Sequence, residues 1–283
     1  MSELKQLRGA ASLFSTSVLR KLVSDGESGF ISLLNDLGLT VNSANPSLVF
    51  QQVYSVLLEN YRSEYVYKNA IAEKLIRGRH KFSKNCYFST EFRVGNSLAD
   101  VVVANGTTTV YEIKTEFDSF ERLESQLNDY EKVFDQIHVV LPEKKVVDWS
   151  KKVPEKFGVT VLSENYTLRE YRSALSNISN IDLSVLFSCF RREEFINVIQ
   201  RQFGFVPKCR PVELKAECKA LFLKLDNDAA HKEFLLALKS RQPRLEKIDL
   251  LKVAPPSLTS ALLSANLTVR EMNTLNSVFR EAN

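Results

Sequence analysis

The stretch ADVVVANGTTTVYEIK, residues 99–114, holds two runs rich in β-branched residues on either side of Asn105-Gly106. Asn-Gly between two such runs is the strongest short-range signal for a β-hairpin. With a three-residue loop, Asp100 would lie directly opposite Glu112, and with a two-residue loop it would lie one step away. Glu112 and Lys114 would share a face because side chains alternate along a strand. The stretch therefore predicts a hairpin whose open end gathers two carboxylates and an amine.

This grouping has a chemical interpretation and a purely structural one. Two carboxylates held close together repel each other, and a divalent cation between them removes the conflict. Oxygen-only ligation suits Mg²⁺ or Mn²⁺, and a nearby ammonium can orient a water or stabilise charge on phosphorus. These are the parts of metal-dependent phosphodiester hydrolysis. The alternative is that Asp100, Glu112 and Lys114 form a surface ion-pair cluster on a solvated strand face.

Around the hairpin, strand patterns and helix patterns alternate. Strands are predicted at CYFSTEFRV (86–94), QIHVVLP (136–142) and FGVTVL (157–162), and helices at YVYKNAIAEKLI (65–76) and DSFERLESQLNDYEKVF (118–134). Asp118 or Ser119 is expected to cap the second helix. The region from 61 to 165 is therefore predicted to be an α/β core with a mixed β-sheet.

Helical patterns dominate both flanks of this core. Residues 1–60 predict helices that are interrupted at SDGESG (24–29), and Pro46 is expected to open a new helix. Residues 166–283 predict a second helical region that begins with LREYRSAL (168–175) and is punctuated by prolines. We expect three regions: a helical N-terminal region, the core at 61–165 and a helical C-terminal region.

Composition limits the remaining classes. The 283 residues are 44% hydrophobic and 25% charged, with a formal net charge of +4, which is typical of a globular protein and permits a nucleic-acid partner. The four cysteines are scattered, so reduced thiols are expected rather than a zinc site. There is no apolar run long enough to span a bilayer and no Walker A motif. We expect a cytoplasmic protein that neither enters a membrane nor uses ATP.

Taken together, the motifs resemble the PD-(D/E)XK nuclease superfamily, the restriction-endonuclease-like nucleases, and especially its RecB-like branch with a QxxxY motif. They also look like a poorly characterised bacterial family within it. The resemblance covers about residues 68–165. It rests on Glu73, Gly95 to Asp100, Glu112-Ile113-Lys114 and Gln126 to Tyr130. This chain departs from the bacterial family at Leu98, where arginine is usual, which puts one phosphate contact or ion pair in doubt.

The resemblance implies a restriction-endonuclease-like fold and a role for each matching residue. Asp100, Glu112 and the Ile113 carbonyl would ligate Mg²⁺ (or Mn²⁺), and Lys114 would position the attacking water. Glu73 would complete the metal shell or be a plain surface residue. Gln126 and Tyr130 would hold the nucleic-acid backbone or the catalytic lysine, or form an exposed polar row.

Basic residues offer further candidates for contact with nucleic acid. Arg122 would bind phosphate or pair with Asp118, and RGRHK (77–81), with Arg77 and Arg79, would contact phosphates or form a solvated loop. Arg191-Arg192 and KSRQPRLEK (239–247) would add a duplex-binding surface or ordinary helix-surface charge.

The predicted function is a metal-dependent nuclease that hydrolyses phosphodiester bonds, with DNA as the expected substrate and 5′-phosphate as the expected product. Genome defence, including phage defence, or DNA processing by a mobile element is the expected setting by analogy. The alternative is a catalytically silent nuclease-fold module that binds nucleic acid or a protein, as an immunity or regulatory partner. A homodimer or a protein partner would use the helical regions.

Overall fold

A mixed six-stranded β-sheet forms the centre of the computed structural model, which describes residues 3–39, 43, 45–79, 86–241 and 243–281. The strands lie in chain order: β1 (Tyr87–Val94), β2 (Ser97–Asn105), β3 (Thr107–Ile113), β4 (Gln136–Pro142), β5 (Gly158–Leu162) and β6 (Leu168–Arg172). β1, β2 and β3 form an antiparallel meander, β4 and β5 continue parallel to β3, and β6 returns antiparallel to β5. The predicted α/β class and the predicted strands of the core are confirmed.

The hairpin between β2 and β3 has the register of the three-residue loop. Asn105 pairs with Thr107 and Val101 with Tyr111, which places Asp100 opposite Glu112 beyond the last pair of the ladder. Gly106 turns the chain with φ +75°, a conformation that glycine adopts without steric cost.

Helices surround the sheet in three groups along the chain. Before it come α1 (Glu3–Ser12), α2 (Thr16–Asp36), α3 (Pro46–Asn60), α4 (Glu64–Ala72) and a π-helix, η1 (Glu73–Arg79). Between the strands lie α5 (Leu123–Glu131), η2 (Glu143–Lys145), α6 (Val146–Trp149) and η3 (Ser150–Lys152). After it come η4 (Ile178–Asn180), α7 (Leu183–Ser188), α8 (Arg192–Phe203), α9 (Leu214–Phe222), α10 (Asn227–Ser240), α11 (Leu245–Val253), η5 (Pro256–Leu258), α12 (Thr259–Ser264) and α13 (Val269–Glu281).

The predicted helix start and the predicted interruption in the N-terminal region are confirmed. Pro46 opens α3, and the Asn45 side chain accepts a hydrogen bond from the Leu48 N–H as its N-cap. The SDGESG interruption is a kink inside α2, where Gly26 has φ +64° and ψ −160°. No helix within the described residues is long and apolar enough to cross a membrane.

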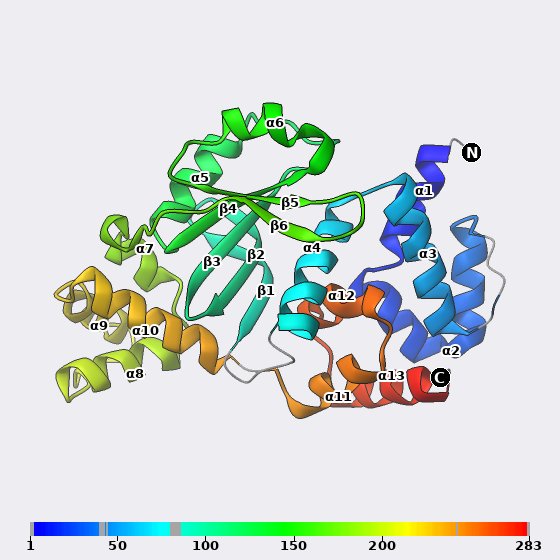
Figure 1. The fold of residues 1–283 in the computed structure, drawn as a ribbon. Helices are drawn as coiled ribbons and strands as arrows, with labels where there is room; N and C mark the ends of the chain where they lie inside the picture. The colour runs from blue at the N-terminus through cyan, green and yellow to red at the C-terminus, as the bar shows by residue number, and fades with distance from the viewer. Residues whose placement is uncertain (1–2, 40–42, 44, 80–85, 242, 282–283) are drawn as a thin grey trace.

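The two faces of the sheet bury separate hydrophobic cores. Alternation sends Val101, Val103 and Ile113 into a core with α1 to α4 and α11 to α13, whereas Val102 and Val110 pack with α5 and α7 to α10 on the other face. Figure 1 shows the two helical groups on opposite sides of the sheet.

The region 166–283, expected as one helical unit, is divided between these two cores. Helices α7 to α10 pack in the core of α5, while α11 to α13 pack against the N-terminal helices. Arg20 of α2 and Glu271 of α13 form an ion pair with Nε–Oε1 at 3.2 Å, which joins the two ends of the chain directly. Figure 1 shows α13 beside α2.

Two local predictions were wrong. LREYRSAL begins with strand β6 rather than a helix, because pairing with the buried strand β5 overrides the helix propensity of its residues. Neither Asp118 nor Ser119 caps α5, which begins at Leu123. Asp118 Oδ2 instead accepts hydrogen bonds from the Thr115 N–H and hydroxyl, at 2.8 and 2.7 Å, and closes a turn before the helix.

Candidate functional site

Asp100 lies where the ladder between β2 and β3 ends. Its Oδ2 accepts a hydrogen bond of 2.7 Å from the Ile113 N–H, so the carboxylate binds the first backbone donor beyond the paired residues. Burial, followed by the charges of Glu112 and Glu64, raises the pKa of Asp100 to about 8, against the opposing effects of the Ile113 N–H and Lys68. The site therefore holds a carboxylate whose ionisation is costly without additional positive charge.

Glu112 and Lys114 face each other, as the alternation predicts. Both side chains are buried, with residues 1% and 6% exposed, and Lys114 Nζ lies 2.9 Å from Glu112 Oε1. The Lys114 N–H donates to the Val140 carbonyl at 3.0 Å, so its backbone still follows β4 after β3 has ended. The structural alternative of a solvated surface cluster is therefore wrong for this pair.

Helix α5 supplies two further groups from adjacent turns. Lys114 Nζ donates to Gln126 Oε1 at 3.0 Å, and the Tyr130 hydroxyl donates to Glu112 Oε2 at 2.7 Å. The i, i+4 spacing puts both side chains on the helix face that covers the sheet. Burial, followed by the charge of Glu112 and its hydrogen bond, raises the pKa of Tyr130, which keeps the phenol a neutral donor.

A Tyr130→Phe substitution should destabilise the protein by about 1–3 kcal/mol, because it leaves the buried Glu112 Oε2 without its donor. Chemical denaturation at pH 7 measures this change. The matched control is Tyr171→Phe on β6, where the side chain is exposed and no comparable loss is expected. Equal stability of wild type and Tyr130→Phe would contradict the role assigned to the phenol.

Sequence reasoning missed a second lysine at the site. Lys68 of α4 is buried, and its Nζ lies 2.5 Å from Glu64 Oε1, 3.6 Å from Glu91 Oε1 and 3.9 Å from Asp100 Oδ1. Burial opposes the charge of Lys68, but its carboxylate neighbours, Glu64 first, give it a raised pKa. Glu91 is held at φ +54°, a strained backbone conformation of the kind that gathers at functional sites. The signal in the sequence was the Glu64/Lys68 pair, spaced i, i+4 on the helix that precedes the hairpin.

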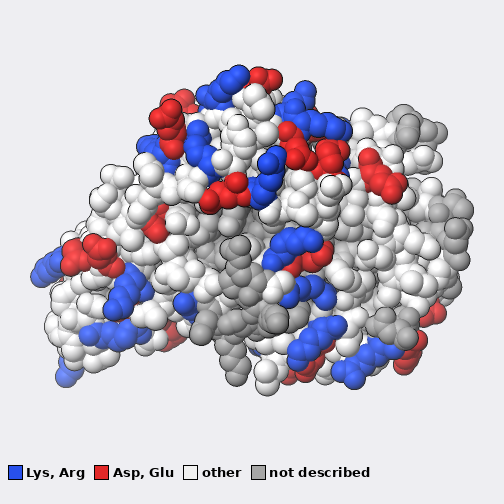
Figure 2. Space-filling view, in the orientation of Figure 1, with Lys and Arg blue, Asp and Glu red and all other residues white. Residues whose placement is uncertain are grey.

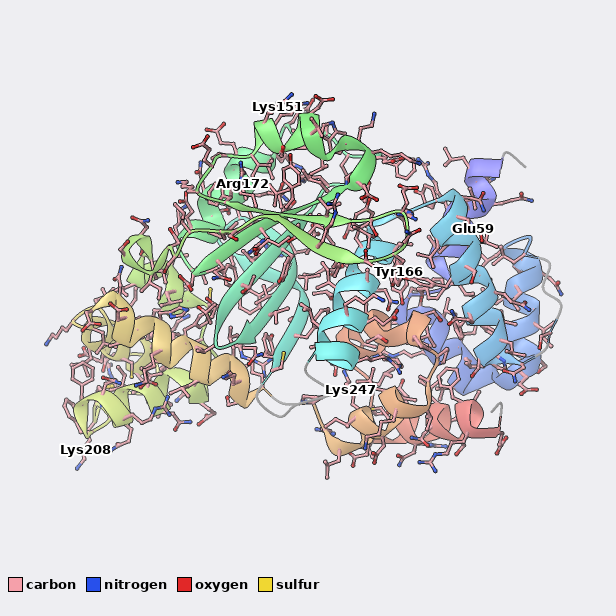
Figure 3. The ribbon with its side chains drawn as sticks, viewed as in Figure 1. Glu59, Lys151, Tyr166, Arg172, Lys208 and Lys247 are labelled. Carbon is pink, nitrogen blue, oxygen red and sulfur yellow. The ribbon has the colours of Figure 1, made fainter. Side chains whose placement is uncertain are left out.

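Glu73 lies in a different cluster. Its Oε2 accepts from the Tyr166 hydroxyl at 3.4 Å and its Oε1 lies 3.8 Å from Lys74 Nζ, whereas the helix acid that interacts electrostatically with Asp100 is Glu64. Figure 3 labels Tyr166, on the loop between β5 and β6, close to α4. On the upstream helix, Glu64 is therefore the acid whose charge acts on Asp100, while the partners of Glu73 are Tyr166 and Lys74.

The predicted arginines are spread over different parts of the molecule. Arg77 donates from Nε to Thr259 Oγ1 at 2.6 Å and from Nη2 to the Ala254 carbonyl at 3.0 Å, so it ties η1 to the C-terminal helices. Burial lowers the pKa of its guanidinium. Arg122 is exposed at the start of α5, while Asp118, its expected partner, bonds to Thr115. The Arg79 side chain and residues 80–85 lie outside the described part of the chain.

Surface charge on the face seen in Figure 1 is mixed. Figure 2 shows Lys and Arg interspersed with Asp and Glu over the described part of this face, in keeping with a net charge of only +4. Nucleic-acid binding on that face would therefore depend on local groups more than on a broad positive field.

The donor set at Asp100 and Glu112 fits a hydrated Mg²⁺ ion. Within the part of the chain that the structure describes, no three His, Cys, Asp and Glu side chains are grouped so as to hold a metal ion. Mg²⁺, however, is usually held by one or two carboxylates and keeps several waters. Each carboxylate oxygen has two lone pairs, so Asp100 and Glu112 retain ligand capacity beside their present hydrogen bonds.

Comparison of the sequence with known proteins identifies the family to which this chain belongs. A family model described as bacteriophage P4 protein cII matches residues 58–254, which is more than half of the chain and includes all the groups around Asp100. Protein cII of Enterobacteria phage P4 is 36% identical over 67 residues, which are 24% of this chain and 25% of that protein, so the alignment spans about a quarter of that relative. No solved structure matches significantly. This chain belongs to the bacteriophage P4 protein cII family.

Proposed function

We propose that this protein is a metal-dependent phosphodiesterase with a restriction-endonuclease-like core that cleaves nucleic acid, with DNA as the expected substrate. One observation carries the proposal. At the open end of the hairpin, Glu112, Lys114, Gln126 and Tyr130 form one hydrogen-bonded set. Asp100 bonds to the neighbouring Ile113 N–H and lies close enough to Glu112 for its charge to act on Asp100. Buried charges cost folding stability unless they are fully paired. Groups of this kind are therefore often found where they perform chemistry.

Asp100, Glu112 and the Ile113 carbonyl would hold Mg²⁺ or Mn²⁺, with Glu64 close enough to Asp100 to add to the negative field. When bound, the divalent ion supplies positive charge at the scissile phosphate and acidifies a water. Burial and, after it, the charges of Glu112 and Glu64 raise the pKa of Asp100. The bound cation would offset the repulsion between these carboxylates, and this relief would contribute to metal affinity.

The side chains of the protein would supply the remaining catalytic functions. Lys114 would orient the attacking water and stabilise the developing negative charge, since its ammonium is a buried, fixed donor. Gln126 holds that ammonium and Tyr130 holds Glu112, so α5 sets the positions of both. Water oxygen would bond to phosphorus as the bond to O3′ breaks, and the 3′ oxygen would take up a proton, leaving 5′-phosphate.

Cleavage assays with metal test this proposal. Wild type, Glu112→Gln and Lys114→Met would be mixed with supercoiled and linear duplex DNA, single-stranded DNA and RNA in Mg²⁺, Mn²⁺ or EDTA. We expect metal-dependent cutting by wild type and a loss of at least about 10²–10³-fold in each variant, the usual cost of removing a preorganised charged group.

Glu124→Gln is the matched control, because Glu124 is an exposed acid on α5 away from the hydrogen-bonded set. Its activity should equal that of wild type. Cutting that persists in both Glu112→Gln and Lys114→Met would exclude the site as the source of activity.

The second candidate function is a silent nuclease-fold module that binds nucleic acid or a protein in a regulatory or immunity role. One observation favours it: Lys114, Glu112, Gln126 and Tyr130 already satisfy one another's hydrogen bonds. Absence of cutting in every metal, together with unchanged nucleic-acid binding in Glu112→Gln and Lys114→Met, would select this candidate. Cytoplasmic genome defence or mobile-element DNA processing remains the proposed setting.

A further inference from the structure

A cavity of about 690 Å³ lies between the two helical groups, at the free edge of the sheet. Its lining combines β1, the N-terminal ends of α8 and α11, the connection between α12 and α13, and Arg20 of α2. The volume is in the range of sites for small organic ligands, which occur preferentially where separate packing units meet. The cavity shares no described lining residue with the Asp100 site.

The charged side chains among the described residues that line this cavity are all cationic. Arg20, Arg191, Arg241, Arg244 and Lys247 line it, and the described lining residues include no Asp or Glu. Arg20 pairs with Glu271, and Arg241 pairs with Glu194. Arg244 and Lys247, in contrast, take part in no salt bridge among the described residues. The cavity therefore has an excess of positive charge.

Lys247 is held by backbone carbonyls rather than by a carboxylate. Its Nζ donates to the Leu263 and Ala265 carbonyls at 3.1 and 2.7 Å, which leaves one of its three N–H donors for another acceptor. Burial alone lowers its pKa to about 8, since no carboxylate offsets the desolvation. Figure 3 labels Lys247 below α12 in that view, at the start of the C-terminal helices.

Apolar side chains complete the cavity. Leu251, Leu267 and Met272 are buried residues of the N- and C-terminal core that also line it, and Tyr87 of β1 adds an aromatic ring. A ligand that suits this lining needs an apolar or aromatic body and an anionic group at one end. Two cations without carboxylate partners, Arg244 and Lys247, match the charge of nearly −2 on a phosphate monoester.

We propose that this cavity binds an organic phosphate, a phosphate monoester on an apolar or aromatic body. The phosphate contacts Lys247 and Arg244, with Arg191 on the opposite helical group, and the body lies against Leu251, Met272 and Tyr87. Such a ligand touches both helical groups and holds them together. Arg244 and Lys247, which belong to the basic stretch 239–247, thus serve a small anion rather than a duplex.

Thermal unfolding and calorimetric titration in EDTA test this site in the whole protein, independently of any cleavage. The probes are adenosine 5′-monophosphate, n-hexyl phosphate and inorganic phosphate. We expect at least one organic phosphate to raise the midpoint of unfolding and to bind at least about tenfold more tightly than inorganic phosphate. The organic phosphate that binds more tightly identifies the body as nucleoside or alkyl.

Arg244→Gln and Lys247→Met should each weaken that binding about tenfold or more, because each removes a charge-assisted hydrogen bond. Arg244 is exposed, so its variant folds even where Lys247→Met does not. Arg270→Gln, an exposed arginine of α13 outside the lining, should bind as wild type does. The proposal is overturned if inorganic phosphate binds as tightly as both organic phosphates, or if Arg244→Gln keeps wild-type affinity.

Discussion

An Asp100→Asn variant should unfold at a higher denaturant concentration than wild type in EDTA, and should cut nucleic acid far more slowly than wild type in Mg²⁺. Burial and the neighbouring carboxylates raise the pKa of Asp100 from 3.8 to about 8, so at neutral pH the folded protein holds a carboxyl group in an unfavourable environment. Asparagine keeps an acceptor for the Ile113 N–H and does not ionise, so it removes the ionisation that favours the unfolded state at this pH. We expect a gain of about 1–3 kcal/mol at pH 7 and a loss of activity of at least about 10²-fold.

The pH dependence of this gain in stability follows from the direction of the pKa shift of Asp100. The pKa of this carboxyl group is higher in the folded state than its value of 3.8 in the unfolded chain. Its contribution to stability is therefore fully present below pH 3.8 and is lost as the pH rises toward 8. The advantage of Asp100→Asn should therefore vanish near pH 4 and be largest near pH 8. Denaturant titrations across this range measure it.

Asp129→Asn is a control for which the change in stability should have the opposite sign. Hydrogen bonds from Lys132 and Ser97 outweigh burial and lower the pKa of Asp129, so its amide variant should lose stability above pH 4. A decrease in stability for both variants would contradict the charge conflict inferred at Asp100.

An Arg241→Met substitution should cost about 3–5 kcal/mol, because it leaves Glu194 buried without its counter-charge. Arg241 Nε and Nη2 each lie 2.7 Å from an oxygen of Glu194, and both side chains are about nine-tenths buried. The guanidinium also packs over the rings of Tyr87 and Phe92, which connects the end of α10 to β1. Equilibrium unfolding in guanidinium chloride measures the loss.

Two comparisons separate the ion pair from general damage at this position. Glu194→Gln combined with Arg241→Met should recover most of the stability, since it leaves no unpaired charge and keeps an acceptor for the Arg191 N–H that caps α8. Arg210→Met on the exposed Arg210–Glu213 pair should change stability little. A double variant no more stable than Arg241→Met would show that the ion pair is not the cause.

Local patterns in the sequence were sufficient for the centre of the fold. Asn105-Gly106 and the alternation of its flanking strands predicted the hairpin, and the hairpin brought Asp100, Glu112 and Lys114 to one end. The spacing of Gln126 and Tyr130 on an amphipathic helix placed both on the face toward the sheet. These predictions succeeded because each depends on contacts within about thirty residues along the chain.

The wrong predictions concern segments whose structure depends on contacts with residues far away in the sequence. Strand β6 exists because β5 offers it a ladder, and nothing within LREYRSAL reveals that partner. The charge of Glu64 acts on Asp100, whereas Glu73 bonds to Tyr166. Helix α4 packs in a core built from both ends of the chain, and those distant partners cannot be found from the helix sequence alone. The division of the C-terminal helices between two cores has the same origin.

The shared core of the first and last helices has a consequence for synthesis. Helices α1 to α3 leave the ribosome almost two hundred residues before α11 to α13 follow. At about 5–20 residues per second, the apolar surfaces that later meet α13 wait roughly 10–40 s for their partner. The apolar faces of the first helices therefore lack their final packing partner during most of synthesis, and slow translation of the middle segment should lower the yield of native protein.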